Sequence, residues 1–166
     1  MTRLLLDTHL VLWWLNGDAR LPQPVLERVQ APEAEVFVSQ ASLWEMAIKL
    51  SIGRLQVDLP ELERQVPLQG FSWLPISNAH LLAVGDLETD GVHRDHFDRL
   101  LACQSRVEPM LLLTADSQLR SYGATGIVIC TGLRRGLLGE ADAHEPSTPR
   151  CRSRAASLAA RLSCRS

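Results

Sequence analysis

The chain has 166 residues and a mass of 18.4 kDa, which suits one domain large enough to bury a core without disulfide bonds or metals. Hydrophobic residues at 46% and charged residues at 22% are typical of a soluble globular protein and exclude a disordered or fibrous chain. No apolar run approaches the roughly 20 residues of a membrane-spanning helix, and three leucines before Asp7 are too few for a signal peptide. We therefore expect a cytoplasmic protein without a membrane partner, whose four widely spaced cysteines are reduced thiols.

The net charge of −2 is unevenly distributed along the chain. Residues 1–130 contain ten basic and sixteen acidic residues, a net charge of −6, whereas residues 131–166 contain seven arginines and three acids, a net charge of +4. Apolar periodicity also stops near residue 130, and the remainder is rich in Arg, Ser, Pro and Ala. This pattern predicts a folded domain over residues 1–130 and a disordered, non-catalytic tail over residues 131–166.

Short apolar runs alternate with helical patterns through the first 130 residues, as in β-α units on a parallel sheet. The predicted strands are residues 3–6, 35–38, 71–74, 110–113 and 127–130. The predicted helices are residues 8–16, 24–31, 42–50, 60–66, 77–87, 97–107 and 117–122. The expected fold is therefore α/β with a mainly parallel sheet, in which ligands bind outside the carboxyl ends of the strands.

Four carboxylates stand where this fold would gather them. Asp7 directly follows the first strand and Asp116 follows the fourth, whereas Glu45 and Asp98 lie near the starts of helices. Each has a purely structural alternative: Ser42 and Glu45 have the spacing of a capping box, and the other three acids suit an N-cap or a first helical turn. All four nevertheless fall where the helix N-termini of a doubly wound sheet come together, which indicates a common site.

Gathering four carboxylates is unfavourable because each raises the pKa of the others, and a divalent cation relieves that repulsion. Only oxygen ligands are on offer, without His or Cys at ligand spacing, so Mg²⁺ or Mn²⁺ is expected rather than Zn²⁺. Such ions retain waters, contact substrate phosphates and activate water against a phosphodiester. The acids therefore indicate a hydrolytic nuclease.

Four motifs in a fixed order also resemble one known family. They are Leu-Leu-Leu-Asp-Thr-His (4–9), Ser-Leu-Trp-Glu-Met-Ala-Ile-Lys (42–49), His-Arg-Asp-His-Phe-Asp-Arg-Leu-Leu (93–101) and Leu-Leu-Thr-Ala-Asp (112–116). With these motifs, residues 2–130 resemble a PIN-domain protein, specifically a VapC-type toxin of a type II toxin–antitoxin pair. The resemblance implies a three-layer α/β/α sandwich, a Mg²⁺- or Mn²⁺-dependent ribonuclease, a cognate antitoxin as partner and a homodimer.

The resemblance also assigns roles to residues. Asp7 and Asp98 would be the principal metal ligands, and Glu45 would complete the site directly or through water. Asp116 would hold the cluster or a second ion, and the hydroxyl of Thr114 would orient water.

One segment departs from the family pattern. The family usually has His-Arg-Asp-Pro-Phe-Asp where this chain has His96 in place of the proline. Asp95 lies three residues before Asp98 and would share the site if the helix began earlier. We favour Asp98, because Asp-Arg-Leu-Leu opens the helix as in the family.

Contacts to RNA phosphates must come from a few residues near the acids, because the net charge of residues 1–130 is negative. The candidates are Arg99, Arg94 and Lys49. Lys49 has an equally plausible alternative, an i,i+4 ion pair with Glu45.

Two other functions remain open from the sequence. The first is a phosphatase or phosphotransferase that is phosphorylated on Asp7, although His9 stands where a haloacid-dehalogenase-type enzyme has its second aspartate. The second is a PIN-like module that binds RNA or a protein partner without turnover.

Overall fold

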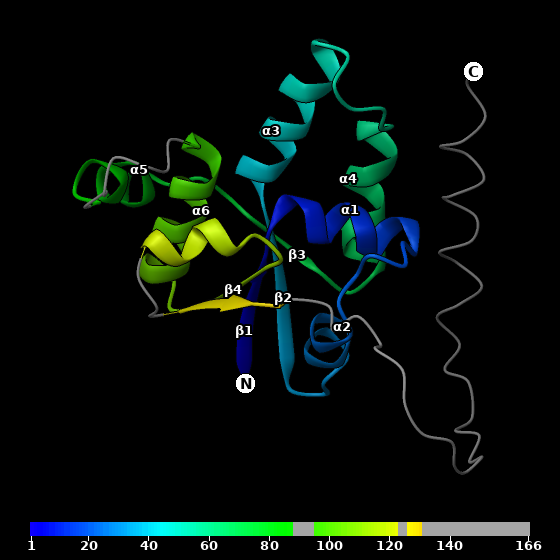
Figure 1. Cartoon of the computed structure of the whole chain (residues 1–166), viewed down its shortest axis with the longest axis horizontal. Coiled ribbons are helices and arrows are strands. Elements are labelled where there is room, and N and C mark those ends of the chain that lie inside the picture. The colour runs from blue at the N-terminus through cyan, green and yellow to red at the C-terminus, as the bar shows by residue number, and fades with distance from the viewer. Residues whose placement is uncertain (88–94, 123–125, 131–166) are drawn as a thin grey trace.

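Five parallel strands form one sheet in the order β3-β2-β1-β4-β5 (Figure 1). This computed structural model describes residues 1–87, 95–122 and 126–130, so the predicted tail lies outside the described residues. The prediction of a parallel sheet is confirmed, and each predicted strand is present within one or two residues. The strands are β1 (Thr2–Leu6), β2 (Ala34–Ser39), β3 (Ser72–Leu74), β4 (Leu111–Thr114) and β5 (Ile127–Ile129).

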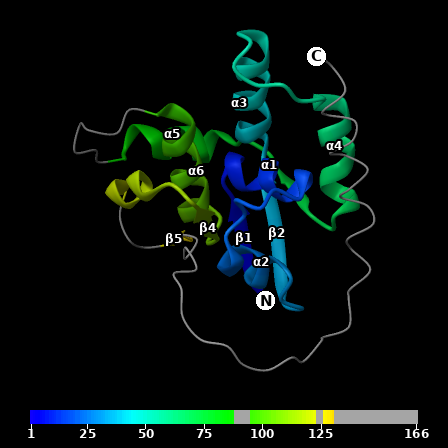
Figure 2. The ribbon, with the colours of Figure 1, turned by 45° about the vertical axis from the view of Figure 1, so that its right-hand side comes forward.

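Helices cover both faces of the sheet and make a three-layer α/β/α fold, as the resemblance implied (Figures 1 and 2). One face carries α1, α2 and α4, and the other carries α5, α6 and η1. None of these helices, within the part of the chain that is described, is long and apolar enough to cross a membrane. The helices are α1 (Thr8–Asn16), α2 (Gln23–Val29), α3 (Gln40–Ser51), α4 (Leu59–Leu68), α5 (Asn78–Gly85), α6 (His96–Val107) and the 3-10 helix η1 (Ser117–Tyr122).

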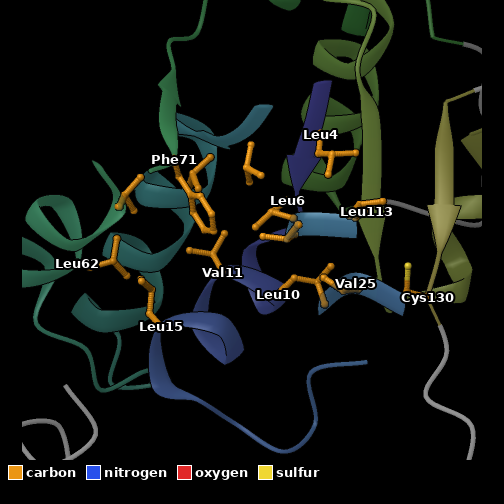
Figure 3. Close-up of a cluster of buried hydrophobic side chains, with 14 of the residues drawn as sticks. Leu4, Leu6, Leu10, Val11, Leu15, Val25, Leu62, Phe71, Leu113 and Cys130 are labelled. Carbon is orange, nitrogen blue, oxygen red and sulfur yellow. The ribbon is translucent and has the colours of Figure 1, made fainter. Parts of the chain in front are cut away.

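Two apolar clusters, one on each face, hold the layers together. In β1, Leu4 and Leu6 point into the first cluster and Leu5 into the second, because successive side chains of a strand face opposite ways. All three are at most 1% exposed. Figure 3 shows the first cluster, where Leu6 packs with Leu10 of α1 and Leu113 of β4. The central strand is therefore buried on both sides, which explains its unbroken run of leucines.

The strand order reverses next to β1. The chain passes from β1 to β2 and β3 on one side, and returns to place β4 and β5 on the other side. Leu6 pairs with Leu113, so the carboxyl ends of β1 and β4 lie at the same edge. In doubly wound sheets this edge, at the point of reversal, is where a ligand crevice forms.

Candidate active site

Asp7 and Thr114 meet at the reversal of strand order. Asp7 follows β1 and is 3% exposed, and Thr114 ends β4 and is fully buried. The Thr114 hydroxyl donates to Asp7 Oδ2 over 2.8 Å and accepts the backbone N–H of Asp116 over 3.0 Å. Burial raises the pKa of Asp7, and the charge of Glu45 adds to the rise while the Thr114 hydrogen bond opposes it. Thr114 thus fixes one predicted acid and connects it to another.

Glu45 lies in the second turn of α3 with both carboxylate oxygens engaged. The Thr8 hydroxyl donates to Oε2 over 2.5 Å, and Lys49 Nζ lies 2.5 Å from Oε1. The structural alternative for Glu45, a capping box with Ser42, is excluded, because α3 begins at Gln40 and its N-cap is Ser39, whose hydroxyl accepts the N–H of Ala41. Glu45 is consequently free of any capping role and points to partners outside its own first turn.

Thr8 is a site residue that sequence reasoning missed. It is 2% exposed and opens α1 directly after Asp7, so the dipeptide Asp7-Thr8 supplies one predicted acid and holds another, Glu45. The sequence does show a hydroxyl residue next to the aspartate that directly follows the first strand. It does not show that this hydroxyl binds Glu45, which lies 37 residues away.

Asp98 occupies the first turn of α6, and Asp95 is the N-cap of that helix. Asp95 Oδ1 accepts the backbone N–H of Phe97 over 2.9 Å and of Asp98 over 3.3 Å. Asp95 is exposed, which suits a cap. Burial raises the pKa of Asp98 to about 8, with further contributions from the charges of Asp95, Asp7, Glu45 and Asp116. The last three of these contributions show that the four predicted acids lie within electrostatic reach of one another.

Asp116 combines a structural contact with its place near the other acids. Its Oδ1 accepts the backbone N–H of Gln118 over 2.8 Å at the start of η1. The structural alternative for this acid, a helix-start contact, is therefore present in the fold. The carboxylate also raises the pKa of Asp98, so the contact with η1 does not remove Asp116 from the cluster.

A buried hydrogen bond ties α3 to α6, the helices that carry Glu45 and Asp98. The hydroxyl of Ser39 donates to Oε1 of Gln104 over 2.6 Å, and both side chains are fully buried. Because the partners are 65 residues apart, this bond fixes the relative position of two segments that meet only in the folded chain.

The family profile of the PIN domain matches residues 4–124 of this chain. The chain belongs to the PIN domain family. Ribonuclease VapC22 of Mycobacterium tuberculosis is 27% identical to this PIN-domain protein over 131 residues, which cover 74% of this chain and 93% of the relative.

Solved structures agree with the fold. VapBC2 from Rickettsia felis, bound to a DNA fragment from its promoter, superposes on this PIN domain with a TM-score of 0.60 at 15% identity, covering 77% of this chain and 98% of that chain. A toxin–antitoxin complex from Klebsiella pneumoniae gives a TM-score of 0.54 at 17% identity, covering 78% and 98%. The α/β/α fold predicted from the resemblance is therefore confirmed.

The PIN-domain acids suit a divalent ion in chemistry and charge. All four offer oxygen ligands. Burial is the main cause of the raised pKa of Asp98 and of Asp7, and the negative charges of neighbouring acids raise both further. Among the described residues no three His, Cys, Asp or Glu side chains converge closely enough to coordinate an ion as they stand. An ion held here by one or two of the acids would complete its coordination with waters, as Mg²⁺ usually does.

The three predicted phosphate contacts have different surroundings in this PIN domain. Lys49 forms the i,i+4 pair with Glu45 that was its structural alternative. Arg99 donates to the carbonyl of Val84 in α5 over 3.3 Å. Arg94 lies outside the described residues.

Proposed function

We propose that this PIN-domain protein is a VapC-type toxin, an endoribonuclease that hydrolyses RNA phosphodiesters with Mg²⁺ or Mn²⁺. The observation that carries the proposal is the set of four carboxylates at the reversal of strand order, whose combined burial and charge raise the pKa of Asp98 to about 8. The 27% identity with a relative named as ribonuclease VapC22 supports the choice of RNA.

In this proposal Asp7 and Asp98 bind the ion, Glu45 completes the site directly or through water, and Asp116 steadies the cluster or a second ion. The bound ion supplies Lewis acidity and a water activated at neutral pH. The hydroxyl of Thr114 holds Asp7 in place by donating to its carboxylate, and it accepts a second hydrogen bond from the backbone N–H of Asp116.

Phosphate binding is assigned to cations beside the acids. Arg99 and Arg94 flank Asp98 in the sequence, and Lys49 lies one helical turn after Glu45. Their contacts with RNA are part of the proposal, and each would mainly change the KM for RNA.

The proposal includes a cognate antitoxin that inhibits the enzyme, a homodimer, a cytoplasmic location and a dispensable tail over residues 131–166. Toxin–antitoxin complexes among the structural neighbours support the antitoxin. Light scattering of the purified chain, alone and with its antitoxin, measures both assemblies. Deletion of residues 131–166 should preserve folding and cleavage, and loss of either would contradict the assignment of the tail.

Incubation of antitoxin-free protein with total RNA and Mg²⁺ or Mn²⁺ tests the activity. We expect cleavage that EDTA abolishes and that Asp7→Asn and Asp98→Asn each reduce at least about 100-fold, as loss of a group that positions a catalytic ion does. Asp58→Asn is the matched control, because Asp58 is an exposed N-cap of α4 and asparagine also caps helices.

Other outcomes would favour the two alternatives. Folded protein that binds Mn²⁺ but cuts no RNA would favour a binding module. A phosphoaspartate trapped at Asp7 would favour a phosphatase, although a carboxylate that is 3% exposed and hydrogen bonded to Thr114 is poorly placed to act as a nucleophile.

A further inference from the structure

We propose that Lys49 is an exchangeable counter-ion of the active site: it neutralises Glu45 while no divalent ion is bound, and the ion displaces it. The inference rests on the proposed metal site and extends it, because it adds a role in metal binding to the RNA contact proposed for Lys49.

The two partners of Glu45 differ in how easily they can leave. Thr8 is buried at the first position of α1, directly attached to Asp7, and its short side chain has almost no access to solvent. The side chain of Lys49 is 37% exposed and reaches Glu45, whose side chain is 8% exposed, from one turn further along α3. Thr8 is therefore the fixed support of the carboxylate, and Lys49 is the partner with access to solvent.

The type of cation is informative as well. Lys49 is the only lysine in the chain, and the other sixteen basic residues are arginines. An arginine binds a carboxylate with a planar fork of donors, whereas a lysine is a point charge on a flexible stem. A lysine can thus neutralise Glu45 and swing away without breaking a two-pronged hydrogen bond.

Charge explains why the site needs such a partner and why an ion would expel it. Glu45 is one of four neighbouring carboxylates, and a buried carboxylate without a counter-charge is strongly destabilising. A divalent ion among the acids provides that counter-charge and repels the ammonium group. Lysine and metal therefore compete for the same carboxylate.

Substitution of Lys49 by Met tests the competition, because it removes the charge and keeps the apolar stem. In EDTA we expect this variant to unfold at a lower temperature than the wild type. Calorimetry should show Mn²⁺ binding about fivefold tighter, because the variant lacks a nearby like charge that repels the ion through a water-like dielectric. Lys49→Arg keeps the charge and should bind Mn²⁺ no more tightly than the wild type. Arg64→Met removes a cation from the exposed pair with Glu61 on α4 and should leave Mn²⁺ affinity unchanged.

Because the chain has one lysine, the displacement can also be observed directly. Reductive ¹³C-methylation labels only Lys49 and the N-terminal amine, and a dimethylated lysine keeps its charge. The Glu45→Gln variant provides the NMR signal of the unpaired side chain. Addition of Mg²⁺ to the wild type should move the Lys49 signal to that position.

The outcomes separate this proposal from the one on which it rests. Failure of the wild type to bind Mn²⁺ or Mg²⁺ overturns both. Metal binding by the wild type with unchanged or weaker affinity in Lys49→Met, or a Lys49 signal that Mg²⁺ leaves in place, overturns the counter-ion and retains the metal site. A Lys49→Met variant that changes the KM for RNA but not the affinity for Mn²⁺ also overturns the counter-ion and leaves Lys49 with the RNA contact alone.

Discussion

Removal of a proposed catalytic acid should stabilise the metal-free protein, and the Asp98→Asn variant shows this most clearly. Asparagine has nearly the same shape but no charge. In the folded chain burial and four neighbouring acids raise the pKa of Asp98 from 3.8 to about 8. Each pKa unit corresponds to about 1.4 kcal/mol, so the complete rise sets a ceiling of roughly 6 kcal/mol. Asp98 is only partly buried, and solvent screening reduces our expectation to about 2 kcal/mol.

The sign of the pH dependence follows from proton binding. Because the pKa of Asp98 is higher in the folded than in the unfolded state, the folded protein retains the proton over a wider pH range. The metal-free wild type should therefore lose stability as pH rises from about 4 to about 8, and the Asp98→Asn variant should lose less. The wild type and the Asp98→Asn variant should be similarly stable at about pH 4 and should differ most at and above about pH 8.

Urea denaturation in EDTA, followed by tryptophan fluorescence across this pH range, measures the difference. Saturating Mn²⁺ should reverse the order, because only the wild type retains the complete ligand set. The Asp58→Asn control should follow the wild type. The reasoning would be refuted by an Asp98→Asn variant that is less stable than the wild type in EDTA at every pH, because Asp98 would then stabilise the fold rather than strain it.

Three further substitutions test individual contacts. Thr114→Val leaves Asp7 without its hydroxyl donor, so it should lower the free energy of unfolding in urea by about 1–3 kcal/mol and weaken Mn²⁺ binding. Thr114→Ser keeps the hydroxyl and should restore both, and equal losses in the two variants would contradict the hydrogen-bond explanation. Gly17→Ala should cost about 1 kcal/mol because Gly17 ends α1 at a φ of 60°, and an unchanged melting temperature would argue against that backbone conformation. Leu113→Ala should cost about 2–5 kcal/mol because the side chain is fully buried in the central sheet, and a loss below about 1 kcal/mol would contradict its place in the core.

The succession of strands and helices could be predicted because it depends on local apolar patterns. The leucines of β1 and the end of α1 at Asn16 are examples, and both lie where expected. The start of α3 was predicted two residues late, because Ser42 and Glu45 have capping-box spacing while Ser39 is the actual cap. A local motif cannot reveal which of two serines lies at the end of the preceding strand.

The site was predictable to the extent that topology places acids at strand ends. Asp7 and Asp116 follow adjacent parallel strands, so their proximity follows from the sheet itself. The hydrogen bonds that hold the acids in place were not predictable in this way. Thr8 and Glu45 are 37 residues apart, Ser39 and Gln104 are 65 residues apart, and both bonds depend on how the helices pack. Sequence periodicity carries no information on such pairings.

The central claim is that Asp7, Glu45, Asp98 and Asp116 form one divalent-ion site. Anomalous diffraction from crystals soaked in Mn²⁺ tests it most directly. The account predicts a manganese peak bound by Asp7 and Asp98, with Glu45 and Asp116 within direct or water-mediated reach. Ordered carboxylates without a peak between them, or a peak bound only by residues elsewhere in the chain, would contradict it.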